Sequence, residues 1–283
     1  MAVSLSIYAS PICKYVDDSR QRFNPKSRRK QLLGHAADVS RGIQSTYQPI
    51  LEQLLVGLSS SQKKQTLKGF RTIIGALVLL ADPLPVSSLS QLLELDCDDV
   101  FYHLNNFPSV LEIPENADSN VPIKLFHLSF QEYLLANDDG TNKFYIEEKA
   151  KHVDLLRCCL RVMTGGSQFR LKNDICQLNE PGVLREEVDP GVIQQHIPQH
   201  LAYACMYWAH HLRNSQMRIR DEDEVHTFLT CYFVHWLEAM SWSWKRKEIV
   251  NTVLMLQDLV GNPESDGKEV AAFVRDARRF IFK

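Results

Sequence analysis

The sequence contains pairs of histidines and cysteines whose residue types could bind a metal ion. His196 and His200 have the i,i+4 spacing that places two imidazoles on one face of a helix, but Pro198 between them is unfavourable to a single regular helix. Cys158-Cys159 and His210-His211 are adjacent, so the two side chains of each pair point to different faces of a helix. No two cysteines have the C-x-x-C spacing of a zinc-binding pair. The spacing therefore favours packing roles over a metal site.

Nucleotide chemistry and nucleophilic catalysis both lack a sequence signature. The pattern G-x-x-x-x-G-K-[ST], whose backbone amides surround the phosphates of ATP in a P-loop, does not occur in the sequence. No acidic strand of the Walker B type is recognisable either. A catalytic serine or cysteine would need an oriented base beside it, and no local pattern indicates one. We therefore expect a chain that is not an enzyme and that carries no cofactor of its own.

The composition is typical of a soluble globular protein. Of the 283 residues, 45% are hydrophobic and 23% are charged, with a formal net charge of -2. This balance gives no general attraction for nucleic acid or for an anionic membrane. The seven cysteines are odd in number and scattered, unlike a disulfide framework. No apolar run approaches the roughly 20 residues that cross a bilayer, and no positive charge precedes the apolar stretch near the N-terminus. These features predict a cytoplasmic protein.

The first part of the chain is predicted to be helical. Four segments are predicted helices: 5–16, 24–35, which begins with the cap and proline Asn24-Pro25, 46–58, whose apolar residues have helical spacing, and the strongly apolar 62–80. A proline-rich turn ends the last of these helices. Two short helices follow, one capped by Ser87 or Ser88 and running to Leu95, the other capped by Asp98 and running to Phe107.

The periodicity then changes from helical to alternating. Residues 110–113 and 123–127 are predicted to form two short strands around a polar loop, and a helix is predicted to start at Ser129 and to run to Leu135. The order of three helices and a hairpin over residues 66–128 is the layout of a winged helix.

The second half of the chain is predicted to be all-helical, which makes the fold class mainly α. Helical spacing is found in the segments 143–163, 181–188, 199–213, 222–243, 245–260 and from 268 to the end. Glycine and proline separate these segments, among them Pro190-Gly191. The aromatic residues of this half are predicted to form its core: Tyr203, Tyr207, Trp208, Tyr232, Phe233 and Trp236. Trp242 and Trp244 lie near a predicted helix end, where either core packing or a partner surface would explain them.

The segment Leu125–Ala136, LFHLSFQEYLLA, resembles the motif that closes the winged helix in NACHT-family proteins. In that family an apolar strand delivers a histidine, which is followed by Ser-Phe and an aromatic-leucine helix. The surrounding motifs are similar to those of the fungal branch, the vegetative-incompatibility STAND NTPases, which are NOD-like receptors that often carry WD repeats. These motifs occur in the family's order at residues 80–89, 110–114, 173–176, 203–208 and 235–239.

The resemblance implies a role for His127. In related proteins the corresponding histidine contacts the phosphates of bound ADP and stabilises a closed, inactive arrangement; chemically, an imidazole N–H can donate a hydrogen bond to a diphosphate oxygen. A ligand that binds one arrangement more tightly shifts the population toward it. His127 is therefore the candidate nucleotide-sensing residue, for ADP or ATP in a full-length parent only. The alternative is a structural histidine bonded to backbone or water, which is the role expected in this chain by itself.

The resemblance also implies a division into three parts. Residues 1–61 would be the C-terminal helices of the NACHT module, 62–140 the winged helix, and 141–283 a helical domain that precedes the sensor repeats. We expect a regulatory segment that couples nucleotide state to domain rearrangement in fungal self/non-self recognition or innate-type immunity. Its partners would be other domains of the parent or partner proteins, with oligomerisation on activation. Alternatives are a piece of an active P-loop ATPase whose catalytic domain is missing here, a divergent hydrolase, and a gene product without a role.

A further alternative is a winged-helix DNA-binding protein. Its recognition helix would span residues 98–107, which begin with Asp98 and Asp99 and contain no lysine or arginine. Carboxylates at the start of that helix would repel the phosphates of a DNA groove. The basic run at residues 26–30 lies elsewhere in the sequence. These residues favour a protein that does not bind nucleic acid.

Overall fold

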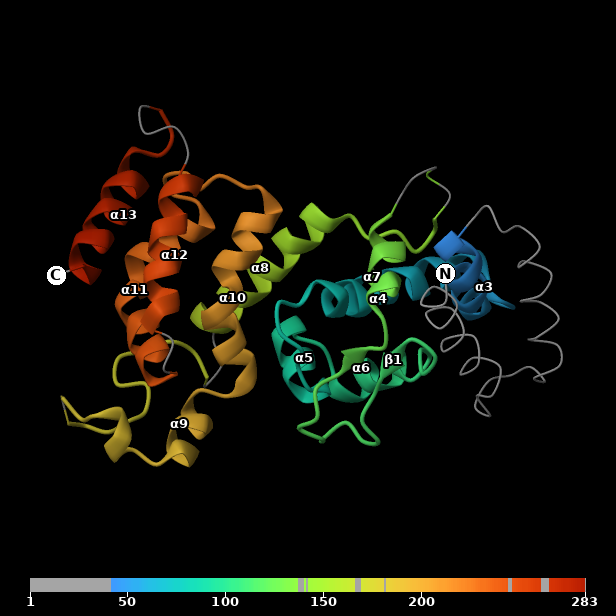
Figure 1. Ribbon diagram of the computed structural model, residues 1–283, viewed down its shortest axis with the longest axis horizontal. Coiled ribbons are helices and arrows are strands. Elements are labelled where there is room, and N and C mark those ends of the chain that lie inside the picture. Colours follow the sequence, from blue (N-terminus) through green and yellow to red (C-terminus); the bar gives the residue numbers. More distant parts are fainter. Residues whose placement is uncertain are drawn as a thin grey trace, which may run out of the picture. The chain divides into compact units, whose positions relative to one another are not determined.

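The computed structural model describes residues 42–136, 140, 142–165, 169–180, 182–243, 246–260 and 265–282. Within these ranges the chain is mainly α, as predicted, with one two-stranded antiparallel sheet (Figure 1). The helices predicted at 5–16 and 24–35, the basic run at 26–30 and Trp244 lie outside the described residues. The chain divides into two compact units. Unit 1 comprises Met1–Ser90 and Leu95–Glu148, and unit 2 comprises Gln91–Glu94 and Lys149–Lys283.

Unit 1 is built around one long helix. Its elements are α3 (Gly42–Glu52), the short 3-10 helix η2 (Gln53–Leu55), α4 (Ser60–Leu79), α5 (Val86–Leu93, of which Gln91–Leu93 belong to unit 2), α6 (Cys97–Leu104), β1 (Leu111–Glu112), β2 (Lys124–Leu125) and α7 (Leu128–Leu135). Helix α4 starts at a capping box, in which the Ser59 hydroxyl accepts from the Gln62 amide and the Gln62 side chain accepts from the Ser59 amide. The C-terminal half of α4 is buried from Ile73 to Leu79 and supplies much of the core of this unit.

Helices α5, α6 and α7 do not start at the caps that the sequence predicted for them. Helix α5 begins at Val86, ahead of the serines predicted to cap it. Helix α6 is capped by Asp96, whose carboxylate accepts from the amides of Asp98 and Asp99, so the prediction that Asp98 is the cap was wrong. Either carboxylate could serve as a cap, and the one that precedes the first helical turn does so. Helix α7 begins at Leu128, and its N-cap is His127 rather than Ser129.

The predicted hairpin is present but short. Leu111 pairs with Leu125, and Glu112 pairs with Lys124, which places opposite charges across the two strands. The amide of Phe126 donates to the carbonyl of Val110, so pairing continues for one more bond beyond the strands. The sequence overestimated both strands because apolar alternation extends past the residues that have a pairing partner.

A segment after α7 holds the C-terminal end of that helix. The Asn142 side chain donates to the carbonyl of Tyr133, and the amide of Ile146 donates to the carbonyl of Leu134. These bonds satisfy carbonyls that the helix end leaves without an intrahelical partner. Arg71 of α4 donates to the carbonyls of Lys143 and Tyr145, which ties the same segment to the long helix.

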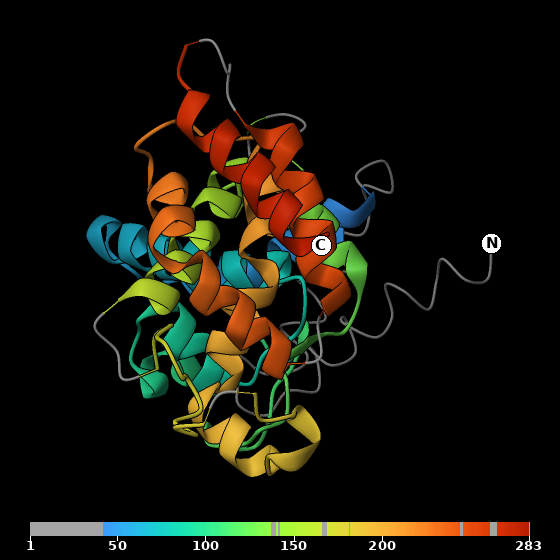
Figure 2. The same ribbon diagram turned by 90° about the vertical axis from the view of Figure 1, so that its left-hand side faces the viewer.

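Unit 2 is a set of packed helices. Its elements are α8 (Glu148–Thr164, of which Glu148 belongs to unit 1), the 3-10 helix η3 (Arg185–Glu187), α9 (Pro190–His196), α10 (Gln199–Ser215), α11 (Glu224–Trp242), α12 (Arg246–Leu259) and α13 (Lys268–Ile281). Helices α12 and α13 lie side by side in both views (Figures 1 and 2). The predicted helix at 181–188 is only the single turn η3. Helix α9 was missed because Pro190 was interpreted as a break, whereas proline favours the first turn of a helix, here after the cap Asp189.

The aromatic core predicted for the second half is confirmed for its central members. Trp208 and Trp236 are fully buried with their rings edge to face, 6.1 Å apart between centroids, and Tyr203 and Phe233 are also buried. The Trp236 indole N–H donates to the carbonyl of Cys205 at 2.8 Å. The remaining predicted members, Tyr207 and Tyr232, are half-buried, as is Trp242.

Candidate functional site

His127 lies at the junction between β2 and α7. Its backbone is extended, with φ -154° and ψ 143°, and the next residue is the first of the helix. The imidazole Nδ1 accepts a hydrogen bond from the backbone amide of Ser129 at 3.0 Å, so the ring caps the helix. Caps are usually oxygen atoms of Ser, Thr, Asp or Asn, and here a ring nitrogen takes that place. The cap fixes the ring at the start of α7.

Two hydroxyl groups continue the hydrogen-bond network from His127. Ser129 Oγ lies 2.8 Å from His127 Nδ1, and the Tyr47 hydroxyl lies 2.8 Å from Ser129 Oγ. Tyr47 comes from α3, is 2% exposed and packs its ring against those of Phe130 and Tyr133, at centroid distances of 5.2 and 5.6 Å. The network Tyr47–Ser129–His127 therefore links α3 to α7.

The other ring nitrogen of His127, Nε2, is the one that could bind a ligand. Because Nδ1 accepts the Ser129 amide proton, the neutral imidazole carries its own proton on Nε2. The side chain is half-buried, and no residue in the described part of the chain hydrogen-bonds Nε2. The arrangement presents one N–H donor, which suits an oxygen acceptor such as a phosphate. Sequence reasoning identified His127 but not Tyr47 or Ser129 as its partners; Tyr47 lies 82 positions from Ser129, and no local pattern connects them.

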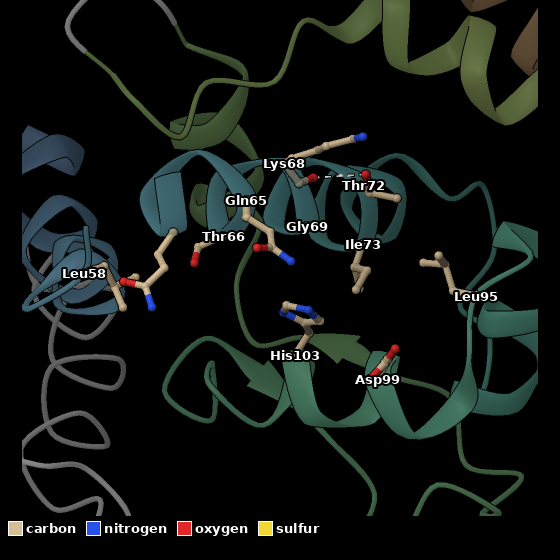
Figure 3. A pocket seen from close by; sticks show the side chains of 11 residues that line it. Leu58, Gln65, Thr66, Lys68, Gly69, Thr72, Ile73, Leu95, Asp99 and His103 are labelled. Atoms are coloured by element: carbon tan, nitrogen blue, oxygen red, sulfur yellow. Dashed lines mark hydrogen bonds between the residues drawn. The ribbon is translucent and has the colours of Figure 1, made fainter. Parts of the chain in front are cut away.

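A cavity of about 540 Å³ lies between α4 and α6 (Figure 3). Gln65 of α4 and His103 of α6 point toward one another across it, and the Lys68 side chain extends away from α6. Its other lining residues are a mixture of polar and apolar side chains: Leu58, Gln62, Thr66, Gly69, Thr72, Ile73, Leu95 and Asp99. His127 does not line this cavity. The mixed lining contains no group of basic residues that would select a phosphate.

The histidine and cysteine pairs lie in unit 2 and serve packing. His196 ends α9 and His200 lies in the first turn of α10, so they do not share one helix, as Pro198 predicted. His200 is buried, which lowers its pKa to about 4. Cys158 and Cys159 are both buried, and burial raises the pKa of each thiol, which opposes thiolate chemistry. Across the described ranges, no three His, Cys, Asp or Glu side chains are grouped to hold a metal ion.

His211 belongs to a second hydrogen-bond network, which the sequence did not predict. Its Nδ1 lies 2.9 Å from Nδ1 of His152, and its Nε2 lies 2.9 Å from the Tyr203 hydroxyl. All three residues are buried. Burial, and next the neighbouring histidine His210, lower the pKa of His152 to about 4. Burial, His152 and His210 lower the pKa of His211 to about 3.

Helix α6, the recognition helix of the DNA-binding alternative, carries Asp98 and Asp99 in its first turn, and both are exposed. Its most exposed apolar side chain is Tyr102, at 71%.

A membrane-crossing helix would have to be longer and more apolar than any helix found in the described ranges.

The chain has a distant sequence similarity to a known protein. The chain is 26% identical over 302 aligned residues to vegetative incompatibility protein HET-E-1 of Podospora anserina. The alignment covers 97% of this chain and 20% of that protein, so the chain spans about a fifth of its relative's length. No family model and no solved structure matches the chain. The similarity supports the fungal vegetative-incompatibility type that the sequence motifs predicted, at the level of a distant resemblance.

Proposed function

We propose that this chain is a regulatory segment of a nucleotide-gated NACHT signalling protein, in which His127 senses the diphosphate of ADP bound by a separate nucleotide domain. The observation that carries the proposal is the geometry of His127. Its ring is fixed by a backbone hydrogen bond at the start of α7, and its Nε2 donor is without a partner in the described part of the chain. In this proposal α4, α5, α6 and the β1–β2 hairpin are a winged helix, and unit 2 is the helical region that follows it.

The proposed mechanism is a population shift. A phosphate oxygen that accepts from Nε2 would stabilise the arrangement in which the winged helix lies against the nucleotide domain. Loss of that contact would favour rotation of unit 1 as a rigid body. The chain itself supplies a donor and no phosphate cradle, because it lacks a P-loop. Its partner is therefore the nucleotide-bearing domain of the same parent protein, and the chain is non-catalytic.

The residues of α6 oppose the DNA-binding alternative. The exposed carboxylates of Asp98 and Asp99 lie in the helix that would enter the groove, and no lysine or arginine occurs in α6. Fluorescence anisotropy with duplex DNA at 50 mM and 200 mM salt should give no binding that weakens with salt, which is the signature of phosphate contacts.

The first test is the coding sequence on both sides of this chain. The proposal expects a P-loop upstream and WD repeats downstream. In the parent protein, His127→Ala should retain less ADP through purification than the native protein, whereas His127→Gln keeps a side-chain donor and should lose less. A parent with an intact P-loop whose ADP content is unchanged in His127→Ala would refute the sensing role. Micromolar ADP binding and ATP hydrolysis by the isolated chain would refute its non-catalytic nature.

A further inference from the structure

The Tyr47–Ser129–His127 network fixes the direction of every proton in it. The backbone amide of Ser129 can only donate, so His127 Nδ1 is an acceptor. With Nδ1 an acceptor, Ser129 Oγ, 2.8 Å from that same nitrogen, donates its hydroxyl proton to Nδ1 and shares the single lone pair with the amide. A hydroxyl has one proton, so the bond between Tyr47 and Ser129 requires Tyr47 to be the donor. The protons therefore run in one direction, from the α3 tyrosine to the imidazole.

We propose that Tyr47 is a positioning residue for His127: it acts through Ser129 to hold the imidazole with its proton on Nε2, and so couples the docking of α3 to the donor that His127 presents. The functional consequence of this coupling rests on the proposed function, but the coupling itself does not. The ring of Tyr47 packs directly on α7 through Phe130 and Tyr133.

The position of Tyr47 makes its hydroxyl sensitive to the docking of α3. The ring is 2% exposed, so its hydroxyl hydrogen-bonds within the protein rather than to bulk water. If α3 moved away from α7, Ser129 would lose its donor and its hydroxyl proton would be free to turn to another acceptor. The imidazole would then keep only the backbone amide at Nδ1, and the preference for the Nε2–H tautomer would weaken.

This coupling defines the class of ligand that the site accepts. With Nε2 held as a donor, the ring accepts a phosphate or carboxylate oxygen and disfavours a donor group. By linkage, an oxygen ligand on Nε2 would strengthen the docking of α3, and docking of α3 would strengthen binding of that ligand. A helix outside the proposed winged helix would thus influence the nucleotide-sensing residue without touching the nucleotide.

The test is NMR spectroscopy of the whole chain with 15N-labelled histidine at pH 8, where exposed imidazoles are neutral. Couplings between each ring nitrogen and the ring carbon-bound protons identify the protonated nitrogen, and His127→Gln assigns the signals among the 10 histidines. We expect the native His127 to be protonated at Nε2. In Tyr47→Phe, which keeps the ring, we expect the fraction protonated at Nδ1 to rise about fivefold, the ratio that corresponds to one neutral hydrogen bond.

Tyr133→Phe is the matched control. Its ring also packs on Tyr47, but its hydroxyl is outside the network, so the tautomer ratio should equal that of the native protein. Ser129→Ala should raise the Nδ1–H fraction and Ser129→Thr, which restores a hydroxyl, should reverse the rise. This rescue remains informative if Tyr47→Phe does not fold.

A native His127 protonated at Nδ1, or a tautomer ratio unchanged by both Tyr47→Phe and Ser129→Ala, would overturn the positioning role and leave the proposed function standing. The expected tautomers together with a parent that retains ADP equally well in His127→Ala would overturn the proposed function alone.

Discussion

Each unit contains a histidine that is connected to a tyrosine hydroxyl, and the two histidines differ in what they have left to bind. In unit 1, His127 is half-buried, and its network with Tyr47 uses Nδ1 alone. In unit 2, His211 is fully buried and uses both nitrogens, one for His152 and one for Tyr203. The His127 ring keeps one N–H donor for a ligand, whereas both nitrogens of the His211 ring are already hydrogen-bonded.

This difference shows that a strongly lowered histidine pKa does not by itself indicate a ligand site in this chain. Strongly shifted pKa values often mark functional sites. Here the lowered pKa values of His152 and His211 are caused first by burial and then by other histidines, with no carboxylate among their causes. Such a pair is a packing feature that tolerates no charge. Of His127 and His211, His127 is the one that keeps an unfilled hydrogen-bonding position in the described part of the chain.

The largest effect that we expect from the difference between the two networks is a loss of stability of unit 2 in acid. The folded pKa values of His152 and His211, about 4 and about 3, lie below the ordinary value of 6.5. The unfolded chain therefore binds protons that the folded chain excludes. The stability that the neutral pair gives to the folded state is complete above pH 6.5 and is lost as the pH falls toward 4. We expect protonation of this pair to lower the free energy of unfolding of unit 2 by on the order of 6 kcal/mol between pH 7.5 and 4.

Tryptophan fluorescence during urea unfolding measures this loss for unit 2 alone, because all four tryptophans follow residue 149. The control is the double variant His152→Asn with His211→Asn, which keeps polar atoms near both Nδ1 positions and removes both titrations. It should be less stable at pH 7.5 and lose less stability in acid. His200, whose pKa is also lowered to about 4, is present in both proteins and cancels. Equal losses in the two proteins would show that the pair is not the cause.

A matched pair of Tyr→Phe substitutions compares the two networks directly. Tyr203→Phe leaves His211 Nε2 buried without the phenol, and we expect a loss of about 2 kcal/mol. Tyr47→Phe removes one neutral hydrogen bond, the bond to Ser129 Oγ, and we expect a loss of about 1 kcal/mol. Hydrogen exchange of the amides in α10 and α7 measures each loss in its own unit. A Tyr203→Phe loss no larger than the Tyr47→Phe loss would contradict the difference between a filled and an open network.

The sequence predicted those parts of the fold that depend on local pattern. From residue 42 on, the helices and the hairpin of unit 1 appear in the predicted order, and the aromatic residues Trp208 and Trp236 occupy the core of unit 2. Errors arose at helix ends, where Asp96 and His127 act as caps in place of Asp98 and Ser129. Capping depends on which side chain precedes the first helical turn, and neighbouring polar residues are nearly equivalent by type alone.

The candidate site was predictable only in part. The motif selected His127, and its nucleotide-sensing role stays a prediction. The contribution of Tyr47 depends on α3 packing on α7, which is a tertiary contact between segments 82 positions apart. The pairing of His152 with His211 depends in the same way on α8 meeting α10. No periodicity or spacing within one helix encodes such contacts.

The smallest expected effect concerns the space around a third histidine, His103, in unit 1. Gly69 lies within α4, and a Cβ at this position would lie 3.2 Å from His103 Cε1. Alanine is favoured over glycine inside a helix by about 1 kcal/mol. His103 borders the open cavity and can shift by a few tenths of an ångström, so we expect Gly69→Ala to stabilise unit 1 by about 0.5 kcal/mol. Hydrogen exchange across α4 should show the gain, with tryptophan fluorescence of unit 2 unchanged.

In a His103→Ala background, the gain should rise toward the full helical preference, because the close contact is gone. A loss of stability that persists in that background would mean that the wall of the cavity is as tightly packed as the surroundings of His211. The difference in packing between the two units would then be limited to the surroundings of His127.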